Sequence, residues 1–226
     1  MFFKELFYPK ICLGCGFLGA YICPVCQNKL KRINKDSCLY CGRASLNGFT
    51  HPACKREKRI DGFISLFYYD NRLKKIIKEI KYRKTLEALN ELVFLIDYSL
   101  VNKLKYFITK DLIIQAIPLH PQREKERGFN QVEPITRQLN QLTGVPIKNI
   151  LLRIKPTAYQ AQIEKKQQRL INIRGVFSLK KGEKINKNNF LIVDDVLTTG
   201  STVKEAARVL KDNGADKIFV FTLAKG

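Results

Sequence analysis

The stretch FLIVDDVLTTGST, residues 190–202, carries the signals that decide the fold. An apolar run rich in β-branched residues is typical of a buried strand, and this one leads directly to two neighbouring acids, Asp194 and Asp195. A loop of small and hydroxylated residues comes next: Thr198, Thr199, Gly200, Ser201 and Thr202. A helical pattern over 201–213 follows, with Gly214 where a helix commonly ends. The order strand, loop, helix indicates an α/β protein.

The rest of the chain from residue 61 repeats this rhythm. Apolar runs at 63–70, 112–119 and 216–224 predict further strands, and helical spacing appears over 71–82, after Thr85 and over 128–142, where Pro134 marks either the true start or a kink. Alternating strands and helices predict right-handed crossovers and a doubly wound parallel sheet over 61–226. Ligands of such sheets bind outside the carboxyl ends of the strands, where both the acid pair and 118–120 are expected.

The hydroxylated loop has the properties of a phosphate site. The first N–H groups of a helix lack intrahelical partners, and the helix dipole adds positive potential there. Plain capping needs one hydroxyl, whereas this loop offers four. Two carboxylates would repel a phosphate unless they accept hydrogen bonds from sugar hydroxyls. The pattern therefore predicts a ribose 5-phosphate site, with the phosphate on the loop and the hydroxyls on the acids.

Residues 1–60 contain a duplication, CLGCGFLGAYICPVCQNKLKRI at 12–33 and CLYCGRASLNGFTHPACKREKRI at 38–60. Each unit opens with C-x-x-C-G and closes with a second ligand pair. The predicted metal ligands are Cys12, Cys15, Cys23 and Cys26 in the first unit, and Cys38, Cys41, His51 and Cys54 in the second. Four such ligands suit tetrahedral zinc, and metal would contribute most of the folding energy of so short a unit. One zinc per sequential unit is expected; interleaved pairing, or a single filled site, is the alternative. The units either bind nucleic acid or brace the neighbouring domain.

Composition adds broader expectations. The 226 residues carry a formal net charge of +21, which favours polyanionic partners, although a lysine-biased composition without specific purpose gives the same number. Lys4 and Glu5 interrupt the N-terminus before a signal-peptide core develops, and no run approaches the roughly 18 apolar residues of a membrane span. We expect a cytoplasmic protein, where seven cysteines indicate metal more than disulfides. Residues 1–8 either make a peripheral membrane contact or pack against the protein.

These motifs together resemble a known family. FLIVDDVLTTGST is similar to the ribose-phosphate signature of type I phosphoribosyltransferases, which bind phosphoribosyl pyrophosphate. The cysteine pairs, EIKYRK at 79–84, IPLHPQREKERGFNQ at 117–131 and TAYQAQIEKKQQRLINIRGVF at 157–177 resemble the ComF family, linked with natural competence. His51 departs from the cysteine that many relatives carry, but it preserves a ligand.

The resemblance implies roles for particular residues. Asp194 and Asp195 would contact the ribose and serve catalysis, and residues 198–202 would bind the 5-phosphate. A pyrophosphate loop would include Leu119, His120, Arg123 and Arg127, with Mg²⁺ held on the pyrophosphate. His120 could act in acid–base chemistry or be structural, and residues 157–174 form either a mobile lid or a solvated helix. Residues 128–131 belong to the family pattern without a chemical role that the sequence reveals.

Two functions follow from this reading. One is a phosphoribosyl pyrophosphate-binding protein of DNA uptake, whose partners are single-stranded DNA and proteins of the uptake machinery. The other is an active phosphoribosyltransferase of nucleotide metabolism, which displaces pyrophosphate from C1 of the ribose in favour of an acceptor that the sequence does not identify.

Overall fold

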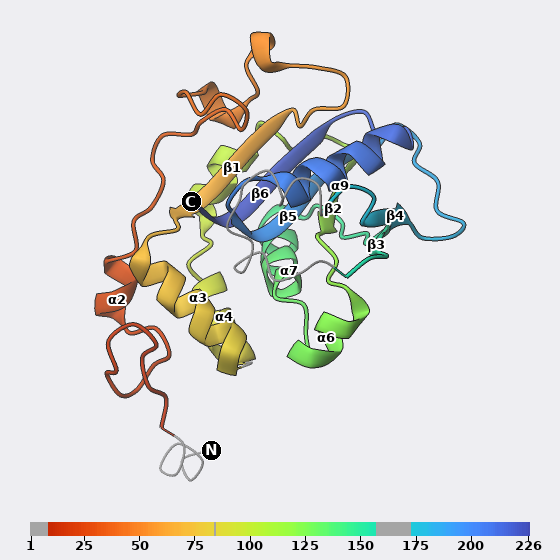
Figure 1. The fold of residues 1–226 in the computed structure, drawn as a ribbon. Helices are drawn as coiled ribbons and strands as arrows, with labels where there is room; N and C mark the ends of the chain where they lie inside the picture. Colours follow the sequence, from red (N-terminus) through yellow and green to blue (C-terminus); the bar gives the residue numbers. More distant parts are fainter. Residues whose placement is uncertain (1–8, 84, 157–172) are drawn as a thin grey trace.

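The protein is built on a four-stranded sheet in the order β1-β6-β5-β2 (Figure 1). A computed structural model describes residues 9–83, 85–156 and 173–226. The strands are β1 (Gly62–Tyr68), β2 (Leu112–Ala116), β5 (Asn189–Leu197) and β6 (Ile218–Lys225). All three pairings are parallel, with Gly62 opposite Phe219, Phe190 opposite Ile218 and Leu112 opposite Asn189. The predicted parallel topology is confirmed.

Both faces of this sheet are buried, which explains its uninterrupted apolar strands. In β5, Phe190 and Ile192 join one core cluster while Leu191 and Val193 join the other. Alternate residues of a strand point to opposite faces, so a strand buried on both sides loses the polar alternation of a half-exposed one.

Helices cover the two faces. The helices α3 (Asn71–Arg83), α4 (Leu86–Val93), α5 (Tyr98–Leu104) and α7 (Val132–Thr143) pack on one face. On the other face lie α9 (Ser201–Asp212) and a small antiparallel sheet of β3 (Leu151–Arg153) and β4 (Phe177–Leu179). Short helices complete the described chain: α2 (Pro24–Asn28), η1 (Leu46–Gly48), η2 (Pro52–Cys54) and α6 (Pro121–Arg127).

The segment after β2 differs from the expected loop and long helix. Residues 121–127 form α6, which ends at Gly128 with φ 80°, and α7 begins only at Val132. Pro134 is therefore neither a helix start nor a kink. It lies in the first turn, where N–H groups have no intrahelical partner and proline is tolerated.

The first cysteine unit packs into the main core. Cys12, Cys23 and Cys26 belong to the same buried cluster as Ile76 of α3 and Leu92 of α4, and Figure 1 shows α2 beside α3. The division of the chain at residue 60 stays a prediction. Within the described part of the chain, none of the helices has both the length and the apolarity needed to span a bilayer.

Candidate functional site

The eight predicted metal ligands gather into two groups of four. Cys12, Cys15, Cys23 and Cys26 form one, and Cys38, Cys41, His51 and Cys54 form the other, with the ligand atoms of each group all within 4.8 Å of one another. Cys15 Sγ lies 3.6 Å from Cys23 Sγ, and Cys41 Sγ lies 3.3 Å from His51 Nδ1. Zn–S bonds of about 2.3 Å in a tetrahedron place two sulfurs about 3.8 Å apart, so both groups fit zinc. The grouping is sequential rather than interleaved.

Local backbone geometry explains why these ligands converge. Gly16 and Gly42, which follow the C-x-x-C turns, have φ of 83° and 72°, values that favour glycine. Cys23 is the N-cap of α2 and His51 the N-cap of η2. His51 Nε2 lies 3.0 Å from the Ala44 carbonyl and donates to it, which leaves Nδ1 as the metal-facing nitrogen.

The acid pair lies inside β5 rather than beyond its end, because the strand continues to Leu197. Asp194 Oδ1 accepts from the Asp195 N–H at 2.9 Å. Lys81 of α3 forms an ion pair with Asp195; their side chains are only 29% and 18% exposed. The segment EIKYRK at 79–84 belongs to the family pattern, but the sequence alone predicts no role for it. In the structure, its Lys81 contacts the acid pair.

The two acids differ in charge. Burial, and to a smaller extent repulsion by the negative charge of Asp195, together raise the pKa of Asp194 to about 8. Burial also tends to raise the pKa of Asp195, but the charge and hydrogen bond of Lys81 outweigh it and the pKa is lowered. The raised pKa of Asp194 favours a single shared proton on the pair near neutral pH, and the remaining negative charge faces the ammonium group of Lys81.

The loop 198–202 leads into α9 with an open helix start. Gly200 is the N-cap with φ 71°, and no side chain caps the helix from that position. Thr199 Oγ1 lies 2.9 Å from Ser201 Oγ and accepts weakly from the Ser201 N–H at 3.4 Å. Thr198 is exposed, while Ser201 is only 5% exposed. The hydroxyls of Thr199 and Ser201 therefore contact each other within the loop, whereas the side chain of Thr198 is exposed to solvent.

Three guanidinium groups interact electrostatically with one another or with the acid pair. Arg123 and Arg127 stand on α6, and Arg153 on β3 was missed by the sequence reading. Burial lowers the pKa of Arg153, the positive charges of Arg123 and Arg127 lower it too, and the negative charge of Asp194 raises it. Arg153 is 8% exposed in a strand whose neighbour Leu152 points outward, and a charged residue at an inward position of LLR was the signal that could have found it.

The residues between the strand and α7 have structural contacts. His120 is the N-cap of α6, and its Nδ1 accepts from the Gln122 N–H at 3.4 Å. Asn130 donates to the Ile117 carbonyl at 3.1 Å and accepts from the Val132 N–H at 3.1 Å, which ties α7 to the segment after β2. Gln131 accepts from Arg127 at 2.9 Å. Leu119, the first residue of the expected pyrophosphate loop, is partly buried.

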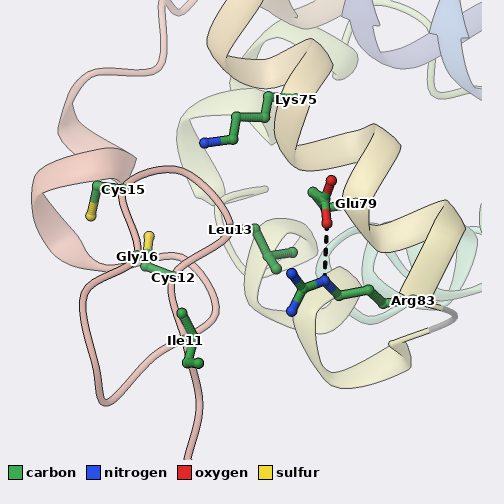
Figure 2. Close-up of a pocket in the computed structure, with 8 residues that line it drawn as sticks. All are labelled: Ile11, Cys12, Leu13, Cys15, Gly16, Lys75, Glu79 and Arg83. Atoms are coloured by element: carbon green, nitrogen blue, oxygen red, sulfur yellow. Dashed lines mark hydrogen bonds and ion pairs between the residues drawn. The ribbon is translucent and has the colours of Figure 1, made fainter.

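A cavity of about 320 Å³ lies elsewhere, between the first metal unit and α3 (Figure 2). Lys75 donates to the Gly14 carbonyl at 3.1 Å, and Arg83 pairs with Glu79 at 2.9 Å along the helix wall. Neither acid of β5 lines this cavity. The expectations for residues 1–8 and for most of the lid, 157–172, lie outside the described residues.

Comparison with known proteins shows which proteins this chain is similar to. Residues 127–226, which include β5, the loop and α9, match the family model of the phosphoribosyl transferase domain. The chain is 29% identical over 222 residues to "Competence protein F" of Haemophilus influenzae, with 90% of each chain covered. It is 29% identical over 215 residues to "Competence protein ComFC" of Bacillus subtilis, covering 90% of this chain and 84% of that one. The chain is similar to the ComF competence proteins over about nine-tenths of its length.

A third relative extends the match to almost the full length of this chain. "DNA utilization protein YhgH" of Escherichia coli O157:H7 is 28% identical over 228 residues, covering 96% of this chain and 97% of its own. The resemblance to the ComF proteins and the parallel α/β fold expected from the sequence are confirmed.

Proposed function

We propose that this protein, like the ComF proteins that it resembles, binds phosphoribosyl pyrophosphate at the carboxyl edge of β5 and acts in DNA uptake. The observation that carries the first part is the Lys81–Asp195 ion pair beside Asp194, whose pKa is raised by burial. Two ionised acids would repel a phosphate, but this pair retains a single negative charge that Lys81 neutralises. The acids are then free to serve the ribose hydroxyls, Asp195 as an acceptor and Asp194 as a donor or acceptor.

The other residues divide the remaining parts of the ligand. The backbone N–H groups at the start of α9 and the hydroxyls of Thr198 and Thr202 would bind the 5-phosphate. Arg123, Arg127 and Arg153 would offset the charge of the pyrophosphate, since guanidinium groups bind phosphate oxygens in bidentate fashion. Mg²⁺ bound with the pyrophosphate would supply further neutralisation of its charge.

Calorimetric titration with phosphoribosyl pyrophosphate and Mg²⁺ tests this site. We expect binding by the unchanged protein and much weaker binding after combined Asp194→Asn and Asp195→Asn substitution. Asp111→Asn, at an exposed position before β2, is the matched control and should bind normally. Equal titration heats for all three proteins would exclude the acid pair from the site.

The proposal for DNA uptake rests on the names of the relatives and on charge. Two relatives are called competence proteins and one a DNA utilization protein. A net charge of +21 suits a polyanion such as single-stranded DNA, with proteins of the uptake machinery as further partners. We place this activity in the cytoplasm, where zinc-bound cysteines stay reduced.

An active phosphoribosyltransferase is the second candidate, favoured by the cluster of arginines beside the acids. In that reaction an acceptor attacks C1 of the ribose, and pyrophosphate leaves with the electron pair of the broken C–O bond. The arginines would stabilise the charge that develops on the leaving group. Pyrophosphate release measured with a panel of nucleobases and nucleic acids tests it: release with any acceptor supports the enzyme, and no release with the whole panel supports the binding protein.

A further inference from the structure

The second metal unit, residues 38–60, packs against residues 198–202, the phosphate loop. Leu39 and Tyr40 are the two residues between the ligands Cys38 and Cys41, and both pack on the core cluster that contains Val203 of α9. A Cβ placed on Gly200 would lie 3.6 Å from Leu39 Cδ1. The C-x-x-C turn therefore lies directly against the start of α9.

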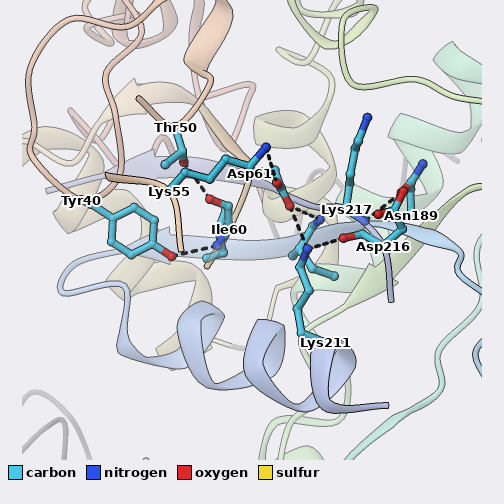
Figure 3. A network of polar contacts seen from close by, with 10 residues as sticks. Tyr40, Thr50, Lys55, Ile60, Asp61, Asn189, Lys211, Asp216 and Lys217 are labelled. Carbon is cyan, nitrogen blue, oxygen red and sulfur yellow. Dashed lines mark hydrogen bonds and ion pairs between the residues drawn. The ribbon is translucent and has the colours of Figure 1, made fainter. Parts of the chain in front are cut away.

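Tyr40 connects this turn to a cation at the loop. Its hydroxyl accepts from the Ile60 N–H at 2.8 Å (Figure 3). Two positive charges lie near the ring, with Arg59 Cζ 4.5 Å and Lys204 Nζ 5.4 Å from its centre. Lys204 donates in turn to the Thr199 carbonyl at 3.4 Å. A continuous set of contacts thus runs from the metal unit through Tyr40 and Lys204 to the loop.

The far end of the unit is fixed to the same helix. Lys55 and Lys211 of α9 both pair with Asp61, at 3.7 and 3.2 Å, and Figure 3 shows the three side chains converging. Lys58 pairs with Asp212 at the end of α9, at 2.6 Å. The second unit therefore contacts α9 along its length, and a change in the shape of the unit must be transmitted to the helix or break these contacts.

The first unit offers a built-in contrast. Its corresponding dipeptide is Leu13 and Gly14; Leu13 is buried in the opposite core cluster, and the Gly14 carbonyl accepts from Lys75 of α3. The C-x-x-C turn of the first unit therefore packs against α3, whereas that of the second unit packs against α9.

We propose that the second metal unit positions the phosphate loop for an anionic ligand, with Tyr40 as the positioning residue. Metal held by Cys38 and Cys41 fixes both ends of the Leu39–Tyr40 dipeptide. Tyr40 then holds the ammonium group of Lys204 beside Thr199, and Leu39 fixes the backbone at Gly200. This inference rests on the proposed sugar-phosphate site at residues 198–202 and adds a second element that sets its affinity.

Titration of the zinc-loaded protein with ribose 5-phosphate tests it. Tyr40→Leu removes the aromatic face that Lys204 contacts, and we expect the dissociation constant to rise about tenfold, within the usual range for a partly buried cation–π contact. Tyr40→Phe keeps the face and loses only the hydrogen bond to Ile60. It should lower the melting temperature while the dissociation constant changes less than about twofold.

Two further variants keep the test decisive. Leu39→Ala opens space beside Gly200 and should also weaken binding, which covers the case in which Tyr40→Leu does not fold. Leu13→Ala, in the first unit, should lower the melting temperature and leave the dissociation constant unchanged.

The outcomes separate the inference from the function beneath it. If the unchanged protein binds ribose 5-phosphate and Tyr40→Leu and Leu39→Ala bind it equally well, the positioning role is overturned and the site stands. Parallel loss of binding and stability in all four variants would show that Tyr40 acts only structurally. If the unchanged protein binds no ribose 5-phosphate, it is the proposed site that fails.

Discussion

Replacing Lys81 by Met tests the charge arrangement at the acids most directly. Met keeps the length and apolar stem of Lys81 but removes its ammonium group. Asp195 would then face Asp194 without a neutralising partner, so its pKa should rise and the two acids should compete for protons. A ribose hydroxyl would lose a charged acceptor, and the phosphates would approach an uncompensated negative charge.

The magnitude follows from the burial of the pair. Exposed ion pairs contribute about 0–1 kcal/mol, whereas breaking a fully buried one costs about 3–5 kcal/mol. Lys81 and Asp195 are 29% and 18% exposed, which is between these cases, so we expect a loss of about 1–3 kcal/mol in the free energy of unfolding. A hydrogen bond to a charged group contributes about 1.5–3 kcal/mol, so the dissociation constant for phosphoribosyl pyrophosphate should rise about 10- to 100-fold.

The assay is calorimetric titration with Mg²⁺ near pH 7.5, together with urea unfolding. Lys78→Met is the control, because Lys78 is an exposed lysine of the same helix and its loss changes the net charge equally. Asp195→Asn and the double variant complete a cycle that isolates the coupling of Lys81 to Asp195. Unchanged binding by Lys81→Met would refute the reasoning, and tighter binding would show that Lys81 competes with the ligand for Asp195.

Three further outcomes are expected. The folded-state pKa of about 8 for Asp194 is above its usual value of about 3.9, so the stability that its protonated form contributes is lost progressively as the pH rises from about 4 through 8; in urea unfolding between about pH 5 and 8, Asp194→Asn should lose less stability than the unchanged protein. Metal analysis should find two zinc ions per chain, with Cys15→Ser and Cys41→Ser each losing a different one, and a metal-free protein with an unchanged melting curve would contradict the two-site assignment. The affinity for single-stranded DNA should fall steeply with salt, with a log–log slope of about −0.7 per phosphate neutralised, and a flat response would remove the electrostatic case.

Local patterns made much of this fold predictable. The apolar strands and the spacing of Leu73, Ile76, Ile77 and Ile80 in α3 reflect burial, which leaves a periodic trace in the sequence. The metal ligands were predictable for a similar reason, because short turns place C-x-x-C pairs together without help from distant residues. The helix α6 was missed because its seven residues, PQREKER, bury none of their side chains and so show no apolar period.

The charges that complete the site could not be found in this way. Lys81 and Arg153 reach the acids of β5 from α3 and β3, and neither is near Asp194 in the sequence. The spacing of apolar residues predicts which face of a helix is buried, but it does not predict which side chains of different elements contact each other. The pKa of Asp195 is lowered by Lys81, so the opposite pKa shifts of the two acids could not be predicted from the sequence either.

The two cysteine units pack near different parts of the proposed phosphoribosyl pyrophosphate site, the first near Lys81 and the second through Tyr40. The first unit packs on α3, the helix that carries Lys81 to Asp195, through the contact of Lys75 with Gly14. The second packs on α9 and the phosphate loop through Leu39 and Tyr40. Replacing Lys81 should therefore affect the ribose half of the site, and replacing Tyr40 should affect the phosphate half. Inorganic phosphate lacks ribose hydroxyls that the acids could bind, so its affinity should depend more strongly on Tyr40 than on Lys81; equal sensitivity to both would mean that the units act on the domain as a whole.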